Sequence, residues 1–506
     1  MNRTSIIALG ALVGALLGHA PGFGQETGRL EVVVREGKQA VPCRIHLYDS
    51  ANKTPKVHGW PAWNDHIVCD ALARLELPAG KYRYEIERGP ESDSISGELA
   101  IVAGSEGKLA ADLVRIADLA SEGWWSGELH VHRPIEDVPL LMRAEDLHVA
   151  PVMTWWNKTN FWAGRTAPAE HVVRFDGNRY YHLMAGEDER EGGALLYFGL
   201  RQPLPITEAE REYPSPMRFL NQARAQAGVH VDIEKPFWWD VPVWLASGQV
   251  DTIGIANNHM CRSKMYPDEA WGKPRDLQRL PAPLGNGYWT QELYYHALNC
   301  GLRIPPSAGS ASGVLPNPLG YNRVYVHLDG ELSYERWFEG LRAGRTFVTN
   351  GPLLRVRAGG QLPGHVFTAQ DQVKVELAGV LQGRDRVEAV EIIRDGRVER
   401  RVPAAELAKT GSLGKLTFRS SGWFLVRAIA DHPQTFRFAS TAPWYVEVGN
   451  VKRRVSRASA QFFLDWTDER IKRVKVGDRA RREEVLEPHR RAREYWAALV
   501  GMANAD

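Results

Sequence analysis

Short runs of alternating apolar and polar residues fill the first part of the chain, from residue 29 to residue 115. The segments 30–34 and 73–77 follow this pattern, and a turn-forming Pro-Ala-Gly segment at 78–80 interrupts it. A period of two residues is typical of strands with one buried face. Because no helical period runs through this part, antiparallel strands packed as a small β-sandwich are predicted for residues 25–118.

From about residue 119 the pattern changes to alternating helical and strand-like segments. Helical spacing occurs at 139–147, 216–227, 290–299 and 334–343, and buried strands are predicted at 149–154, 181–185, 229–232, 251–255 and 323–327. Such alternation is typical of parallel strands joined by helices. We therefore predict an irregular β/α barrel over residues 119–352, with ligands bound at the C-terminal ends of its strands.

Strand patterns return after residue 353, with a hairpin turn at Asp395-Gly396. They predict a C-terminal β domain over 353–450. The last segment, 451–506, has helical spacing and many charged residues, which indicates a helical tail that packs against the body. The chain of 506 residues is therefore expected to be a multidomain protein of the α/β plus β class.

The first 24 residues have the pattern of a cleaved secretory signal peptide. Arg3 precedes an apolar run at 6–17, and small residues follow between 18 and 24. The predicted location of the mature protein is therefore the periplasm or the extracellular space. No later stretch approaches the ~20 apolar residues of a membrane-spanning helix, so stable membrane insertion is not expected.

Charge and cysteine content narrow the possible partners. Lys and Arg number 63 against 61 Asp and Glu, so no overall field attracts nucleic acid, and in the basic tail acidic residues are interleaved. A small-molecule or carbohydrate-derived substrate is the expected partner, and no sequence feature specifies an oligomeric state. In an oxidising compartment we expect a Cys43–Cys69 disulfide, whereas Cys261 and Cys300 form either a second bridge or two buried thiols.

Two histidines that flank a single valine are the strongest chemical signal. In a strand, His130 and His132 point to the same side, and imidazole is the commonest metal ligand. Further ligand-type residues occur in or after other predicted barrel strands. These are Glu187, Asp188, His230 and His259. Their shared position at the ends of barrel strands favours a metal site over a set of unrelated polar residues.

The segment from Gly127 to His132 resembles the first motif of PHP (polymerase and histidinol phosphatase) domains, and Gly186-Glu187 resembles their bridging-carboxylate motif. The blocks at 340–354, 421–423 and 441–446 resemble the CehA/McbA-like metallohydrolases, a secreted branch of this superfamily. The first domain resembles the transthyretin-like modules of exported enzymes.

The resemblance implies a metal-dependent hydrolase that acts on an ester, a carbamate or a phosphoester. It implies His130, His132, Glu187 and His230 as metal ligands, with His259 as a local addition. One or two divalent ions, zinc or manganese and alternatively iron, would activate a water molecule for attack on a carbonyl or phosphoryl centre.

The sequence also departs from this family. Where PHP domains have Thr-Asp-His-Asn, this chain has Thr154-Trp155-Trp156-Asn157, and Ala311 lies within a Gly-Ser-Ala-Ser-Gly run where the family carries further ligands. A reduced metal site is therefore expected. The alternative is a degenerate barrel that binds a carbohydrate or another ligand without turnover.

Residues beside the expected ligands are candidates for the remaining roles. Asp188, Glu136 and Arg190 are the candidate catalytic residues: either carboxylate, or alternatively His259, transfers a proton, and the arginine holds an anionic substrate group. Both Arg190 and Arg133 are alternatively structural or surface residues. The candidate substrate-binding residues are Arg133, Trp155, Trp156 and Asn157. The tryptophans line a substrate cleft or, alternatively, plug the barrel mouth.

Overall fold

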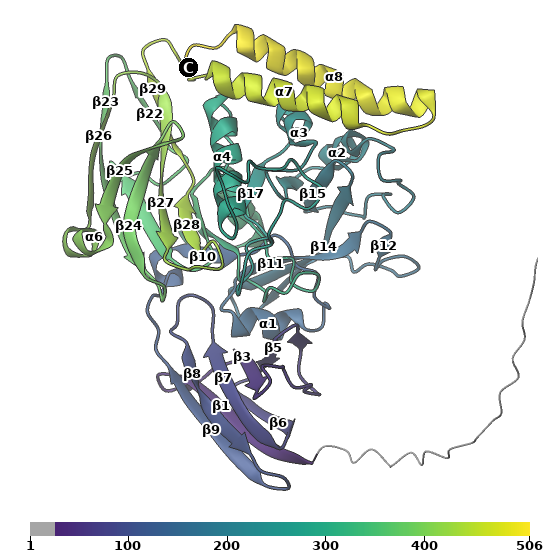
Figure 1. Cartoon of the computed structure of the whole chain (residues 1–506), viewed down its shortest axis with the longest axis vertical. Coiled ribbons are helices and arrows are strands. Elements are labelled where there is room, and N and C mark those ends of the chain that lie inside the picture. Colours follow the sequence, from purple (N-terminus) through teal and green to yellow (C-terminus); the bar gives the residue numbers. More distant parts are fainter. Residues whose placement is uncertain (1–25) are drawn as a thin grey trace, which may run out of the picture.

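A computed structural model describes residues 26–506 as a mixed α/β structure with several sheets and eight α-helices (Figure 1). The predicted signal segment 1–24 lies outside the described residues. Among residues 26–506, no helix combines the length and the apolar character needed to cross a membrane.

Two sheets that share one apolar core form the N-terminal part. The first contains β1 (Thr27–Glu36), β2 (Gln39–Ala40), β6 (Leu72–Pro78) and β9 (Glu106–Leu113), and the second contains β3 (Cys43–Asp49), β4 (Ala62–Trp63), β5 (His66–Cys69), β7 (Gly80–Glu87) and β8 (Ile95–Ile101). Burial alternates along β1 and β6, as the period of two predicts. Side chains such as Leu30 and Ile45 meet between the sheets.

The middle part is built on a mixed sheet. Its strands are β10 (Trp124–Gly127), β11 (Val149–Trp156), β12 (Thr159–Asn160), β13 (Val172–Phe175), β14 (Arg179–Arg190), β15 (Gly193–Phe198), β16 (His230–Ile233), β17 (Thr252–Ala256), β18 (Pro306–Ala308) and β19 (Arg323–His327). Parallel pairing joins β10 to β11, β11 to β14, β16 to β17 and β17 to β18. However, β15 runs antiparallel to both β14 and β16, so the middle sheet is not uniformly parallel.

Helices connect or flank these strands. They are η1 (Ala120–Glu122), α1 (Val138–Ala144), α2 (Pro216–Arg224), α3 (Val241–Ser247), α4 (Gly285–Asn299) and α5 (Tyr334–Arg342). Local sequence sets two of the starts, because the hydroxyls of Ser215 and Ser333 accept backbone N–H groups at the first turns of α2 and α5.

The C-terminal part contains β20 (Thr346–Thr349), β21 (Leu353–Ala358), β22 (Val366–Ala369), β23 (Val373–Gln382), β24 (Val387–Arg394), β25 (Arg397–Pro403), α6 (Ala404–Thr410), β26 (Ser412–Phe418), β27 (Gly422–Ala430), β28 (Phe438–Thr441) and β29 (Trp444–Val448). Hydrogen bonds continue from β19 to β20 and from β20 to β28. The middle and C-terminal sheets are therefore joined across the boundary expected at residue 352.

Two long helices, α7 (Arg457–Arg473) and α8 (Arg479–Gly501), form the tail and lie side by side along one edge of the molecule (Figure 1). They contact α3, and α7 also contacts α4. Trp466 and Trp496 are buried in the same apolar core as the middle sheet. The indole N–H of Trp496 donates to the Pro242 carbonyl at 3.0 Å, which anchors the tail to α3.

All four cysteines are buried free thiols, which corrects the expected Cys43–Cys69 disulfide. The two residues do face each other across β3 and β5, as their location in one β region suggested. Burial and the nearby Glu145 carboxylate raise the pKa of the Cys43 thiol to about 12. The thiolate needed for disulfide chemistry is therefore strongly disfavoured in the folded protein.

Candidate metal centre and substrate cleft

His130 and His132 lie in an extended segment that follows β10. Val131 between them forms bridges to Val152 on one side and to Ser312 on the other, and its side chain is fully buried. The alternation of an extended chain therefore directs both imidazoles to the same side. Gly309 makes room for them, because a Cβ atom at this position would lie 2.5 Å from the Cβ of His130.

Three ligand-type atoms converge at this point. The Nε2 atoms of His130 and His132 are 2.9 Å apart, and each lies 3.2 Å from Oε2 of Glu187 on β14. His130 and Glu187 are buried, and the side chain of His132 is only 8% exposed. The three atoms are close enough to hold one metal ion.

Glu234 determines which nitrogen of His130 faces the centre. Its Oε1 lies 3.3 Å from Nδ1 of His130, and its carboxylate accepts hydrogen bonds from Lys235, Trp238 and Asn258. The Nδ1 atom therefore carries a proton, and Nε2 faces His132 and Glu187, where it can bind an ion or, with no ion present, a second proton. A carboxylate behind a histidine ligand in this way is a frequent arrangement in metal sites, where it sets the tautomer and the ring orientation.

The electrostatics of the cluster favour a cation between these atoms. Burial alone disfavours a charged His130, but the carboxylates of Glu187 and Glu234 outweigh it and raise the pKa of His130 to about 10. Burial opposes ionisation of Glu187 too, yet the two histidines hold its pKa well below the usual range. Three acceptor atoms in mutual contact need a proton or a metal ion between them, and two imidazoles with one carboxylate suit zinc or manganese.

Sequence reasoning selected His230 on β16 and missed Glu234, which follows the end of the same strand. The structure places His230 at the start of the strand, where its Nε2 lies 2.8 Å from the Thr252 hydroxyl. Its ring packs against Phe198 and Phe338, and burial lowers its pKa to about 3. His230 is therefore not among the clustered residues. The position of Glu234, directly after the strand, was the available signal.

His259 follows β17, as expected, but it does not join the three clustered side chains. Its Nδ1 lies 3.1 Å from the carbonyl oxygen of Asp268, and its ring packs between Phe237 and Tyr266. Burial lowers the pKa of His259 to about 3, so this imidazole is neutral. The contacts describe a buried histidine held by its own loop.

Asp188 and Arg190 pair with each other and not with the cluster. The guanidinium of Arg190 donates to both carboxylate oxygens of Asp188, at 2.5 and 2.8 Å, and also to the Pro214 carbonyl. Because Asp188 directly follows Glu187 in β14, its side chain points to the opposite face of the strand. This pair ties β14 to the segment before α2, which differs from the catalytic role expected for it.

A cleft of about 470 Å³ opens beside His132. Its walls include Arg133, Glu136, Trp155 and Trp156, four of the residues singled out in the sequence. The ring of Trp156 lies 4.8 Å from that of His132, and its indole N–H donates to Glu189 at 3.3 Å. The apolar residues Ile135, Met153, Phe161 and Val314 also contribute to the lining.

Trp155 and Asn157 serve mainly to shape the polypeptide around the centre. Trp155 stacks on Tyr197 with ring centroids 5.9 Å apart, and it covers Gly186 so closely that a Cβ there would lie 1.9 Å from the indole. Asn157 has a φ of 49° and accepts the backbone N–H of Glu189 through its side chain. Asn157 therefore holds the turn after β11 and does not line the cleft.

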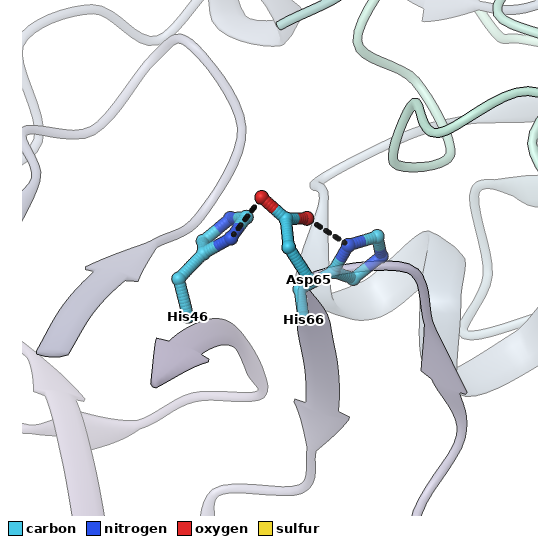
Figure 2. Close-up of side chains that lie close together, drawn as sticks. All are labelled: His46, Asp65 and His66. Atoms are coloured by element: carbon cyan, nitrogen blue, oxygen red, sulfur yellow. Dashed lines mark hydrogen bonds and ion pairs between the residues drawn. The ribbon is translucent and has the colours of Figure 1, made fainter. Parts of the chain in front are cut away.

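A second group of ligand-type side chains lies in the N-terminal part, outside all expected site residues. Figure 2 shows Asp65 between two cross-strand histidines, with Nδ1 of His46 and Nδ1 of His66 each 3.3 Å from a carboxylate oxygen. These atoms are also close enough to hold an ion. However, Nε of Arg44, which always carries a hydrogen, donates to Nε2 of His46 at 3.0 Å. The proton of neutral His46 is therefore on Nδ1, the atom that an ion would need.

Comparison with known proteins does not assign the chain to a family. No family model matches the sequence, and no curated protein matches it. Among solved structures, the minor pilin GBS52 of the gram-positive pathogen Streptococcus agalactiae is similar over 19% of this chain and 47% of the pilin, at 15% identity and a TM-score of 0.16. The matched region thus spans about half of the pilin.

Proposed function

We propose that this protein is a metal-dependent hydrolase that uses an activated water molecule to cleave an ester, a carbamate or a phosphoester. One observation carries the proposal: His130, His132 and Glu187 direct three acceptor atoms at one another beside a cleft of about 470 Å³. Buried groups of this kind are costly unless a cation joins them.

The proposal includes the fold and the location of the protein. We interpret the middle part as an irregular β/α barrel of the PHP type and the two N-terminal sheets as a sandwich beside it. The shared core of those two sheets and the parallel pairs around β10, β11 and β14 support this interpretation. An exported protein that cleaves small molecules agrees with the signal-like pattern of the first 24 residues.

Each residue of the centre has a distinct role in the proposed reaction. His130, His132 and Glu187 would hold the ion, and Glu234 would keep Nε2 of His130 directed at it. A bound zinc or manganese ion supplies Lewis acidity and lowers the pKa of water. The oxygen of water would bond to the carbonyl carbon or phosphorus, the bond to the leaving group would break, and the departing oxygen or nitrogen would take up the proton that water loses. Glu136, exposed on the wall of the cleft, can accept the proton that water loses.

The test combines metal analysis with hydrolysis of p-nitrophenyl acetate and p-nitrophenyl phosphate. The wild-type protein is expected to bind zinc or manganese and to cleave at least one of these compounds. His130→Ala and Glu187→Ala should lose both properties. His171→Ala is the control, since this half-buried histidine lines another cavity together with His230. Turnover that persists in the metal-free protein or in both site variants would contradict the proposal.

A binding protein without turnover is the second candidate, favoured by the two tryptophans at Trp155 and Trp156. Both line the cleft, at positions where ligand-type residues were expected. This candidate predicts metal binding and saturable ligand binding with no product formed. The two candidates differ in turnover alone, which the same assay measures.

A further inference from the structure

One buried cation beside the centre lacks a hydrogen-bonded anionic partner. The side chain of Arg133, directly after His132, is only 3% exposed. Its Nη2 reaches the carbonyl oxygen of Ala62 at 3.4 Å and lies 3.8 Å from the Asp137 carboxylate. Within residues 26–506, its Nη1 is buried with no hydrogen-bond partner.

Two other buried arginines of the middle and tail segments, by contrast, are hydrogen-bonded to carboxylates. Arg190 makes two hydrogen bonds to Asp188, and Arg470 makes two to Glu212 and one to Asp240. A guanidinium has five donors and binds carboxylate or phosphoryl oxygens in a forked geometry. Leaving a buried guanidinium nitrogen without a hydrogen-bond partner is unfavourable, so Nη1 of Arg133 has unused capacity to bind an anionic oxygen.

Arg133 lies at the cleft, where a bound substrate could supply the missing anionic oxygen. Arg133 is among the residues that line the cleft, together with His132 and Trp156. The N-terminal part closes in from the other side: the guanidinium lies 5.8 Å from the centre of the Trp63 ring, and the Trp63 indole N–H donates to the Leu315 carbonyl at 2.7 Å. Strand β4 therefore fixes the arginine against the middle part.

We propose that the substrate carries an anionic oxygen group, a carboxylate or a phosphoryl group, and that Arg133 binds it while the scissile bond lies at the proposed centre. This inference rests on the proposed hydrolase function. The rest of the substrate packs on the apolar walls made by Ile135, Trp156 and Phe161. The substrate class is thus an anionic ester, carbamate or phosphoester with an apolar body.

The first experiment measures anion binding without turnover. Calorimetric titration of the chelator-treated protein with inorganic phosphate, and separately with succinate, distinguishes a phosphoryl from a carboxylate ligand. Arg133→Met is expected to weaken binding of the preferred anion at least about tenfold, because hydrogen bonds to charged groups are worth ~1.5–3 kcal/mol. Arg133→Lys should keep part of the affinity, since it keeps the charge but not the fork.

Two further variants serve as controls for this titration. Arg165→Met removes an exposed arginine that lies 4.0 Å from the ring of Phe161 at the same cleft, and it should leave the affinity unchanged. Asp137→Asn removes the nearest carboxylate and should leave anion binding as strong or stronger. Absence of binding to the wild type, or equal binding to wild type and a folded Arg133→Met protein, overturns the inference.

The second experiment separates this inference from the proposed function. With the metal-loaded protein, kcat/KM is measured for p-nitrophenyl acetate and for mono-p-nitrophenyl succinate, which carries an additional carboxylate. Arg133→Met should lower the value for the anionic ester at least about tenfold more than for the neutral ester. An equal loss for both esters overturns the anion site but leaves the hydrolase proposal intact. No hydrolysis of either ester counts against the proposed function, and the binding titration then decides the anion site.

Discussion

Two acidic residues of the candidate centre, Glu187 within β14 and Glu234 directly after β16, have different positions and different expected roles. Glu187 directs a carboxylate oxygen at His130 and His132, whereas Oε1 of Glu234 lies 3.3 Å from Nδ1 of His130, on the other side of the ring. Glu187 would bind the ion directly, and Glu234 would orient His130, which binds the ion. Substitutions at these two positions are therefore expected to differ in severity.

Glu234→Gln is expected to weaken zinc binding by about tenfold to a hundredfold without abolishing it. The amide keeps the shape of the side chain but removes the charge that orients His130. The measurement is a competition titration with a chromophoric zinc chelator. Glu136→Gln, a change on the cleft wall, should leave the affinity unchanged. An unaltered zinc affinity in Glu234→Gln would show that this carboxylate does not support the ligand.

Residues 26–506 contain two His-carboxylate groups that could hold a metal, one at His46, Asp65 and His66 and one at His130, His132 and Glu187. Only the second is expected to bind the ion. His46→Asn should therefore leave the metal content of the purified protein unchanged, because Nδ1 of His46 carries the proton that Arg44 excludes from Nε2. His132→Asn, a matched change in the other group, should remove the metal. Elemental analysis of both variants measures this, and a loss of metal in His46→Asn would locate an ion beside Asp65.

At the scale of elements, local pattern predicts where helices and strands form but not which strands pair. Helices predicted at 216–227 and 334–343 are found as α2 and α5, with serine caps at their starts. The periodicity contains no information on direction, so the antiparallel β15 was not foreseen. The same holds for the site. Alternation predicted the shared face of His130 and His132, but selecting Glu234 instead of His230 required knowing which end of β16 faces the cluster.

The tail helices are held to the body by an ion-pair network at Asp240. Nε of Arg470 and Nε2 of His489 contact its Oδ1 at 2.6 and 3.0 Å. Burial disfavours the charged carboxylate, but the Arg470 guanidinium and the contacts with His489 outweigh burial and lower the pKa of Asp240. The folded state thus has the lower pKa, so this contribution to stability is complete above the unfolded value of ~3.9 and is lost as the pH falls below it.

Asp240→Asn is accordingly expected to destabilise the protein by about 3 kcal/mol at pH 7, with a smaller difference from wild type at pH 3. Thermal unfolding at both pH values measures the change. Asp468→Asn is the control, because its partner Arg493 is on the exposed side of the same two helices. That change should cost less than about 1 kcal/mol. A difference that stays constant with pH would mean that the Asp240 charge does not hold the tail.

At the scale of the whole molecule, one buried carboxylate joins the three parts of the chain. Glu87 at the end of β7 contacts Arg44 of the N-terminal part, Arg262 of the middle part and Arg384 of the C-terminal part. These arginines outweigh the effect of burial and lower the pKa of Glu87 well below its usual range. Sequence alone could not group these residues, because Arg384 is 297 positions from Glu87.

Glu87→Gln is expected to lower the thermal stability by the equivalent of about 3 kcal/mol and to make the N-terminal part more accessible to protease. The reason is that three guanidinium groups, one buried (Arg44) and two partly buried (Arg262 and Arg384), lose their common anion. Limited proteolysis followed by mass spectrometry measures the effect. Glu98→Gln, an exposed change on neighbouring β8, should match the wild type. Equal protease resistance in both variants would show that Glu87 does not hold the three parts of the chain together.

The contact between β4 and Arg133 has a consequence for how this protein can diversify. Ala62 and Trp63 belong to a segment remote in sequence from His130, His132 and Glu187. They nevertheless contact the guanidinium of Arg133 beside the centre. On the proposed assignment, substrate choice and bond cleavage are encoded in separate stretches of polypeptide. Exchange of the short segment around β4 would then change which anion is accepted while the reacting groups stay in place.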